Sequence, residues 1–185
     1  MVDEKQNTDF RVIDSSFFSS RGQELLQLYL LAFTSGELAQ HISPESAGAT
    51  LKELLQRGSG VAAIRNEKIT GAILGMPLGF DRKFPDGQHP AIPLEKTVYI
   101  AELMVHPATR GQGVASELMA VFLENEKTKG NTDAVIRVWN ENKGALHLYR
   151  KQGFTEIASI IQKKIKPDGV TRFQMNKIYL HKKLE

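Results

Sequence analysis

A glycine-containing run in the middle of the chain has the composition of a phosphate-binding loop. Residues 110–115 read Arg-Gly-Gln-Gly-Val-Ala, follow a strongly apolar segment and precede apolar residues at helical spacing. Backbone N–H groups at a helix N-terminus favour a negatively charged ligand, glycine lets that ligand approach the backbone, and the guanidinium of Arg110 suits a phosphate oxygen. A glycine-rich connection that merely turns the chain is the plainer interpretation of the same run.

Two other phosphate-binding motifs fit this run less well. A dinucleotide-binding fingerprint requires glycine where this sequence has Ser116, and it normally follows the first strand of a repeating strand and helix pattern. A Walker loop is excluded because no Gly-Lys pair followed by Ser or Thr occurs after the run.

A second set of residues recurs at helical spacing later in the chain. Asn142, Ala145 and Tyr149 are separated by intervals that place them on one helix face. The small alanine between two polar side chains leaves room for a slender ligand. Taken alone, the set also fits an asparagine that caps a helix and a tyrosine that packs in the core.

Apolar periodicity and capping residues predict the elements that position these two sets. The expected elements, in chain order, are a strand (10–13), a helix (21–33), a helix capped by Ser43 (44–57), a hairpin (61–65 and 69–74), a strand (97–106), a helix from 114 that Gly130 ends, a strand (134–139), a helix (142–152) and two long strands (154–165 and 170–181). Because strand 97–106 is apolar on both alternating faces, we expect it at the centre of a sheet.

A proline-rich stretch interrupts this pattern before the central strand. Four of the seven prolines lie between residues 77 and 93, together with Gly79, Asp86 and Gly87. Such composition predicts a long loop, and long loops in compact domains often serve as lids or binding segments. We therefore expect residues 77–96 to be a lid or a binding loop.

The two sets together resemble the GCN5-related N-acetyltransferase (GNAT) family. Its acyl-CoA loop has Gln or Arg, two residues, Gly, one residue and then Gly or Ala, which Arg110, Gly113 and Ala115 match. The residues that meet its later pattern are Asn142, Ala145, Leu148, Tyr149, Gly153 and Phe154. The order of elements over residues 8–182 also agrees. The resemblance therefore implies a single α/β (α+β) domain with a mixed, twisted central sheet flanked by helices.

The resemblance also implies a role for individual residues. The pyrophosphate of acetyl-CoA would rest on the loop amides, its pantetheine arm would pair with the backbone of residues 103–105, and Asn142 would hold that arm. Tyr149 would protonate the departing thiolate as a general acid. The residues assigned to acetyl-CoA in this way are Leu103, Met104, Val105, Arg110, Gly111, Gln112, Gly113, Val114, Ala115 and Asn142.

Glu102 is a candidate for the general base. A carboxylate between Ile100 and Met104 on a central strand is costly to bury unless it is paired or faces a cleft where a raised pKa is useful. A structural ion pair explains it equally well, and no family motif assigns the role. His106 and Tyr99 are weaker candidates for the same task.

Composition excludes several other classes of protein. The chain has no cysteine, hence no disulfide and no thiolate nucleophile, and no histidine spacing suits a metal. The longest apolar stretches are too short to cross a bilayer, and the first ten residues lack the apolar core of a signal peptide, so we expect a cytoplasmic protein.

Positive charge is concentrated near the C-terminus. Residues 151–185 contain eight Lys or Arg and three Asp or Glu, whereas the whole chain carries a formal charge of +3. A basic end could attract nucleic acid, but spaced lysines on a strand also keep a sheet edge from aggregating. No basic run interleaves with aromatic residues, so we do not expect nucleic-acid binding.

The resemblance therefore implies an acetyl-CoA-dependent N-acetyltransferase, in which an amine attacks the thioester directly. The acceptor would be a primary amine of a small molecule or a polypeptide, and the loop 77–96 would help form its site. A non-catalytic acyl-CoA-binding sensor is the alternative, although a proton donor such as Tyr149 has no use in a sensor. The long final strands could pair in a homodimer.

Overall fold

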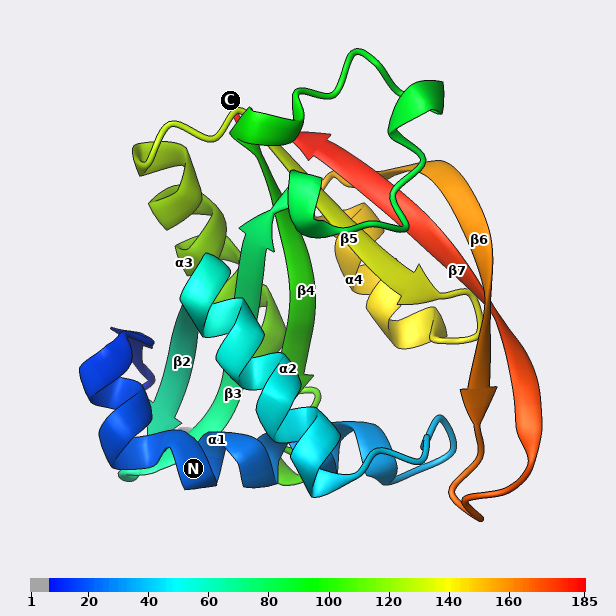
Figure 1. Cartoon of the computed structure of the whole chain (residues 1–185). Coiled ribbons are helices and arrows are strands. Elements are labelled where there is room, and N and C mark those ends of the chain that lie inside the picture. The colour runs from blue at the N-terminus through cyan, green and yellow to red at the C-terminus, as the bar shows by residue number, and fades with distance from the viewer. Residues whose placement is uncertain (1–6) are drawn as a thin grey trace.

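The apolar segments form one mixed sheet in the computed structural model, which describes residues 7–185 (Figure 1). Its strand order is β1-β2-β3-β4-β5-β7-β6, and every neighbouring pair is antiparallel except β4 and β5. The strands are β1 (Asp9–Val12), β2 (Ser59–Arg65), β3 (Lys68–Pro77), β4 (Thr97–Val105), β5 (Asp133–Trp139), β6 (Thr155–Ile165) and β7 (Arg172–Lys183). The predicted mixed sheet flanked by helices is confirmed.

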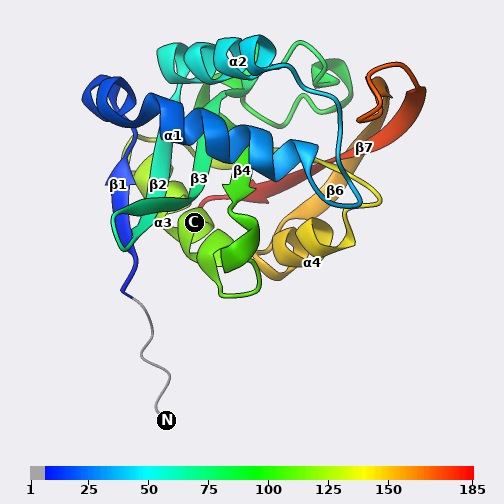
Figure 2. The same ribbon diagram turned by 90° about the horizontal axis from the view of Figure 1, so that it is seen from below.

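Two helices cover each face of the sheet, as Figure 2 shows. They are α1 (Ser15–Thr34) and α2 (Pro44–Arg57) on one face, and α3 (Val114–Thr128) and α4 (Lys143–Lys151) on the other. α2 begins as predicted, with Ser43 accepting a hydrogen bond from the Ser46 N–H. The predicted start of α1 was six residues too late, because the Asp14 carboxylate accepts a hydrogen bond from the Phe17 N–H and caps the helix earlier.

β4 and β5 pair over only part of their length. Thr97–Ile100 pairs with Asp133–Ile136, after which β4 continues to Val105 and β5 to Trp139 without further pairing between them in the described chain. Parallel strands that separate in this way expose the backbone edges of both. The opening lies at the carboxyl ends of β4 and β5, where α/β sheets commonly bind ligands.

A β-bulge changes the direction of the side chains in the middle of β4. Leu74 pairs with Glu102 and Gly75 pairs with Ile100, so Ala101 is an extra residue on β4. As a result, Ile100 packs beneath α3, whereas Met104 packs beneath α1 and α2. Regular alternation would place Ile100, Glu102 and Met104 on one face, and the bulge puts Ile100 on the opposite face from Met104.

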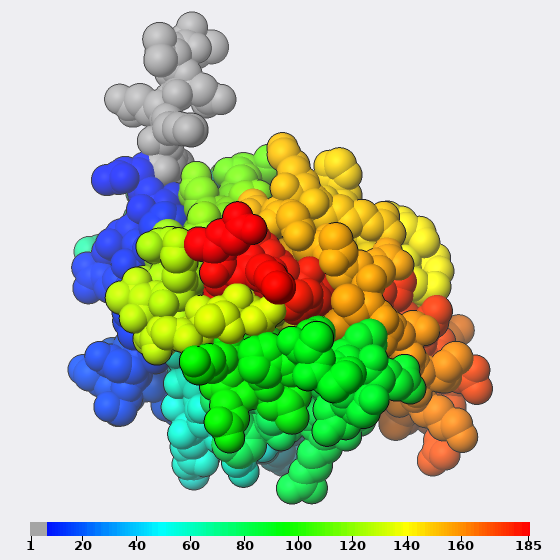
Figure 3. Space-filling view, turned by 90° about the horizontal axis from the view of Figure 1, so that it is seen from above, coloured from blue at the N-terminus to red at the C-terminus, as the bar shows by residue number. Residues whose placement is uncertain are grey.

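The proline-rich loop lies at the other end of the sheet. It contains three short 3₁₀ turns, η1 (Leu78–Phe80), η2 (Asp86–Gln88) and η3 (Leu94–Lys96). Lys96 accepts a hydrogen bond from the Thr132 N–H, and Thr132 accepts one from the Leu184 N–H. In the view of Figure 3, the green segment that contains the loop lies beside the C-terminal residues in red. The loop thus covers the amino ends of β4 and β5.

The two final strands form a long hairpin at one edge of the sheet. β7 is inserted between β5 and β6, so β6 is the edge strand. The turn between them is fixed by Asp168, whose carboxylate accepts hydrogen bonds from the N–H groups of Val170 and Thr171. Over residues 7–185, no helix combines the length and the apolarity needed to cross a membrane.

Candidate active site

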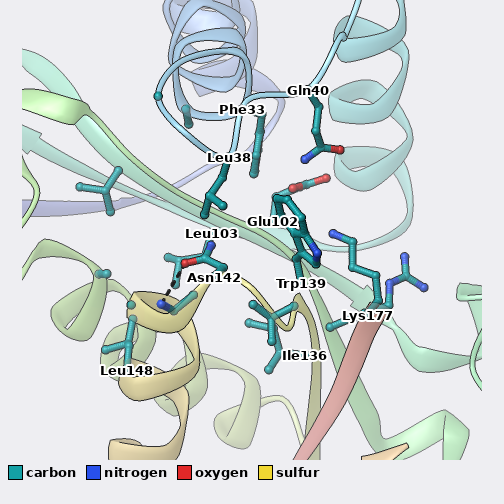
Figure 4. Close-up of a pocket in the computed structure, with 18 of the residues that line it drawn as sticks. Phe33, Leu38, Gln40, Glu102, Leu103, Ile136, Trp139, Asn142, Leu148 and Lys177 are labelled. Atoms are coloured by element: carbon teal, nitrogen blue, oxygen red, sulfur yellow. Dashed lines mark hydrogen bonds between the residues drawn. The ribbon is translucent and has the colours of Figure 1, made fainter. Parts of the chain in front are cut away.

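A cavity of about 580 Å³ passes through the sheet where β4 and β5 separate. Tyr149 and Leu148 line it from the side of α4, and Tyr29 and Phe33 line it from the side of α1. Figure 4 shows Asn142 and Leu148 on one side of Leu103, with Gln40 and Glu102 on the other. The cavity therefore connects the two faces of the sheet, so two reactants could meet in it from opposite sides.

The predicted phosphate loop leads into α3 with the required backbone conformation. Gly111 and Gly113 have φ angles of 77° and 84°, which residues with a side chain adopt only with strain. Arg110, Gly111 and Ala115 line the cavity, whereas Val114 is buried in the core. Within the described chain, five N–H groups of this segment donate no hydrogen bond to the protein. They belong to Gly111, Gly113, Val114, Ala115 and Ser116. Such a group of free N–H donors suits an anion.

Arg65 of β2, which the sequence did not single out, contacts the loop and the first turn of α3. Arg65 is 8% exposed on β2, and its guanidinium donates hydrogen bonds to Gln112 Oε1 at 2.8 Å and to Thr8 Oγ1 at 2.8 Å. The same guanidinium lies 3.9 Å from a Glu117 carboxylate oxygen in the first turn of α3. The Gln112 side chain thus faces Arg65 and is absent from the cavity lining.

β4 contributes an open backbone edge to the cavity. Leu103 and Val105 line it, and beyond Ile100 the edge of β4 that faces β5 has no strand partner in the described chain. The Met104 side chain is fully buried beneath α1 and α2, so only its backbone can contribute to the predicted pairing with pantetheine. An extended ligand could hydrogen-bond along this edge as an added strand does.

α4 places Asn142 and Tyr149 on the wall of the cavity. The Asn142 side-chain oxygen accepts a hydrogen bond from the Ala145 N–H at 3.1 Å, so this residue caps the helix and lines the cavity at once. Tyr149 is 6% exposed, and its hydroxyl has no hydrogen-bond partner among residues 7–185. Burial, assisted by the nearby Glu102 carboxyl, raises the pKa of Tyr149 and keeps its hydroxyl protonated.

Glu102 reaches the cavity from the opposite side of the sheet. The bulge at Ala101 sets its direction, and the Tyr29 hydroxyl of α1 donates a hydrogen bond to it at 3.1 Å. Burial raises the pKa of Glu102 to about 7, against the opposing effects of the Tyr29 hydrogen bond and of the nearby Lys177. A carboxyl with this pKa can accept a proton near neutrality.

Two lysines that the sequence did not single out complete this side of the cavity. Lys164 of β6 and Lys177 of β7 line it together with Trp139 at the end of β5. Burial lowers the pKa of Lys177 to about 8, and the neighbouring positive charge of Lys164 adds to that effect. Alternation along the strands could have placed these side chains on one face, but only the strand order brings them to the cavity.

Several residues that the sequence assigned to the site lie outside the cavity or contact other groups of the protein. None of residues 77–96 is among those that line the cavity, contrary to the expectation for the proline-rich loop. His106 is also outside it, and its Nδ1 accepts a hydrogen bond from the Ala108 N–H. Tyr99 lines the cavity but packs against the Arg137 guanidinium. In the described chain no group of three or more acidic, histidine or cysteine residues could hold a metal ion.

Comparison with known proteins identifies relatives of this chain. The profile of the Acetyltransferase (GNAT) family matches residues 23–154. N-acetyltransferase 8F1 of Rattus norvegicus is 27% identical over 132 residues, which are 69% of this chain and 55% of that protein. An acetyltransferase of Agrobacterium fabrum is 38% identical over 63 residues, which are 34% of this chain and 44% of that protein. The chain thus spans about half the length of these curated relatives.

Solved structures share the fold over nearly the whole chain. An N-acetyltransferase from Staphylococcus aureus superposes with a TM-score of 0.72 at 16% identity, covering 97% of this chain and 99% of that one. A putative acetyltransferase from Salmonella typhimurium, solved with its cofactor acetyl-CoA, gives a TM-score of 0.66 at 18% identity, with 97% and 95% covered. Because the family profile also spans well over half of the sequence, the chain belongs to the GNAT family of acetyltransferases.

Proposed function

We propose that this protein is an N-acetyltransferase that moves the acetyl group of acetyl-CoA to a primary amine by direct attack on the thioester. The observation that carries the proposal is the cavity through the sheet, which joins a set of free N–H donors on one face to Glu102 on the other. Family membership and the acetyl-CoA-bound Salmonella structure support the identity of the donor.

The residues on the α3 and α4 side are suited to bind acetyl-CoA. The free N–H groups of Gly111 and of residues 113–116, together with the Arg110 guanidinium, offer donors for pyrophosphate oxygens. The unpaired edge of β4 around Leu103 and Val105 offers backbone groups to the pantetheine arm, and the side-chain amide of Asn142 lies across from it. Bound acetyl-CoA supplies the activated acetyl group.

Two residues on opposite faces of the sheet are suited to transfer protons in the reaction. Glu102 is suited to remove a proton from the amine, because a pKa of about 7 leaves much of it ionised at neutral pH. Tyr149 is suited to give a proton to the departing thiolate, because its hydroxyl stays protonated and unbonded at the cavity wall. Because the cavity opens to both faces of the sheet, it could align the two reactants, and such alignment is expected to supply much of the rate enhancement.

The first test is a thermal-shift comparison of the purified protein with acetyl-CoA, CoA, NAD and no ligand. A ligand that binds only the folded state raises the melting temperature by mass action. We expect a rise with both CoA species and none with NAD. No rise at millimolar acetyl-CoA would refute the binding assignment.

A second measurement separates an enzyme from a sensor. A panel of primary amines is incubated with protein and acetyl-CoA, and released thiol is followed together with the acetylated product. Amine-dependent thiol release is the expected result. Binding of acetyl-CoA with no release for any amine would instead identify a non-catalytic acyl-CoA-binding protein.

A further inference from the structure

The cavity half on the α1 and α2 side carries an excess of positive charge. Lys177 pairs with Ile160 across β6 and β7, and Lys164 lies four residues beyond Ile160, so strand alternation puts both lysines on one face. Lys177 also pairs with Trp139 of β5 in the other direction. Figure 4 shows the Lys177 side chain directed toward Glu102 and Trp139. The two ammonium groups therefore belong to one wall.

Neither lysine has an ionic partner within the described chain. No carboxylate lies within 4.0 Å of Lys164 or Lys177, and neither side chain donates a hydrogen bond to the protein. The third cation of this wall, Arg137, is already matched by Asp81, with which it forms two hydrogen bonds of 3.1 and 3.2 Å. A carboxylate of the protein thus balances Arg137 but not the lysines.

The remaining charges near the lysines do not restore balance. Lys83 of the proline-rich loop is close enough to lower the pKa of Lys177 further. The carboxyl group of Glu102 raises the pKa of both lysines, but it already accepts a hydrogen bond from Tyr29. Glu37 also lines the cavity, but it is exposed and is not among the groups that shift the pKa of either lysine.

Unmatched cations in a partly buried wall indicate an anionic ligand. Removing an ammonium group from water costs free energy that only a counter-charge or hydrogen bonds offset. The phosphates of acetyl-CoA have their own donors at the loop before α3, on the opposite face of the sheet. The second reactant is therefore the expected source of a counter-charge for Lys164 and Lys177.

On the α1 and α2 side, a contact between the α1–α2 connection and the end of β6 narrows the entrance to the cavity. This contact restricts the size of the second reactant. The His41 N–H in the connection between α1 and α2 donates a 3.0 Å hydrogen bond to the Ile165 carbonyl at the end of β6. A side chain on Gly169, in the hairpin turn, would contact the His41 ring. The connection therefore lies against the tip of the β6 and β7 hairpin, and this closure favours a small molecule over a folded polypeptide.

We propose, on the basis of the function proposed above, that the acceptor is a small molecule with an anionic group beside its primary amine, and that Lys164 and Lys177 hold this group. The amine then lies toward Glu102, which faces the same half of the cavity. The shared chemistry is that of a carboxylate or a phosphate ester close to an amine, as in an amino acid or an amino-alcohol phosphate.

Matched acceptor pairs test the proposal. Each pair differs only in the anionic group: glycine and glycinamide, leucine and leucinamide, phosphoethanolamine and ethanolamine. Rates of thiol release are compared as kcat/KM per concentration of free amine, which corrects for the different protonated fractions. The ratio of the uncatalysed rates of the same two amines with acetyl-CoA corrects for their different nucleophilicity. We expect the anionic member of at least one pair to be preferred by tenfold or more, and the pair that shows it tells carboxylate from phosphate. Equal or greater rates for every neutral member would overturn the proposal.

Substitutions then connect the preference to the lysines. Lys164→Gln and Lys177→Gln should each lower kcat/KM for the anionic acceptor about tenfold more than for its neutral partner, with little change in the KM for acetyl-CoA. Loss of either lysine also raises the pKa of Glu102, and this effect is common to both members of the pair. Lys163→Gln is the matched control, because Lys163 is exposed on the other face of β6 and does not line the cavity. Equal losses for both members of the pair would contradict the assignment.

The single tryptophan gives a readout that needs no turnover. Trp139 lines this half of the cavity, and its ring lies 5.8 Å from that of Phe173, which pairs with Lys164. We expect K164Q/K177Q to weaken quenching of its fluorescence by iodide and to strengthen quenching by caesium, relative to the unsubstituted protein, while leaving acrylamide quenching unchanged. Unaltered iodide quenching in the double variant would refute the positive wall. If no amine is acetylated, the proposed function and this acceptor fail together, even where quenching confirms the charge.

Discussion

Glu102 gives the site a protonation state that changes near neutral pH. Its pKa of about 7 arises mainly from burial beneath α1, so the ionised, proton-accepting form is lost as the pH falls through 7. We expect kcat/KM to rise with pH with a midpoint near 7. Glu102→Gln should remove this rise and lower kcat by about 10²-fold or more. A second rise at higher pH, from the amine of the acceptor, should remain. If kcat/KM of the Glu102→Gln variant still rises with a midpoint near pH 7, Glu102 is not the base.

The same substitution distinguishes a catalytic loss from a folding defect. Because the folded state raises the pKa of this carboxyl, ionisation opposes folding, and this residue costs stability progressively as the pH rises from about 4.5 to 7. Glu102→Gln should therefore leave the melting temperature nearly unchanged at pH 4 and raise it at pH 8. A less active but more stable variant at pH 8 would show that the lost activity is not a loss of structure.

Tyr149 tests the other half of the proton transfer. Tyr149→Phe removes a hydroxyl that has no protein partner in the described chain, so no buried group is left unpaired and folding should be unaffected. We expect kcat to fall about 10- to 100-fold with little change in the affinity for acetyl-CoA, measured by thermal shift. A large loss of affinity with unchanged turnover would assign Tyr149 to binding instead.

At the scale of elements, Arg65 links β2 to the loop that begins α3. The hydrogen bond to Gln112 and the proximity to Glu117 hold the loop in one conformation. Arg65→Met should loosen the loop and raise the KM for acetyl-CoA about tenfold while kcat stays near its normal value, as expected of a positioning residue. Arg11→Met is the control, since Arg11 is exposed on β1 and pairs only with Asp9 in the described chain. A fall in kcat without a rise in KM would contradict this role.

The order of elements was predictable because each is encoded locally. Apolar periodicity located the helices and strands, and Ser43 and Asn142 marked two helix starts that the structure confirms. The insertion of β7 between β5 and β6 was not predictable, because pairing of distant strands leaves no local signal. The bulge at Ala101 was missed for a similar reason, since it is defined by the register with β3.

The candidate site likewise has parts that local sequence predicts and parts that depend on the pairing of distant strands. The loop before α3 and the residues on α4 could be predicted because each lies on one continuous segment with fixed spacing. Lys164, Lys177 and Gln40 come from segments far apart in the chain, and only the assembled sheet brings them together. The proline-rich loop was misplaced because composition shows that a segment is irregular but not which end of the sheet it covers.

At the scale of the whole molecule, the sheet of the described chain consists of strands β1 to β4 and strands β5 to β7, and the two parts meet only where β4 pairs with β5. The cavity lies where these two strands diverge. β4 and β5 are joined by four paired residues on each strand, and a buried polar cluster adds to that connection. Arg137 of β5 and the Tyr179 hydroxyl of β7 both hydrogen-bond to Asp81, which follows β3 and η1. The Arg137 guanidinium also stacks on Tyr99 of β4. This cluster spans the junction that the cavity weakens.

Asp81 should therefore matter to the stability of the whole protein. Its side chain is 7% exposed. Removing it leaves the Arg137 guanidinium without a counter-charge, with the Tyr179 hydroxyl as its remaining acceptor, and leaves that hydroxyl without an acceptor in the described chain. We expect Asp81→Ala to lower the free energy of unfolding in urea by about 3 kcal/mol. Glu95→Ala, an exposed carboxylate lost from the same loop, should change it by less than about 0.5 kcal/mol. Equal stability of the two variants would mean that the four residue pairs between β4 and β5 hold the two strands together without help from Asp81.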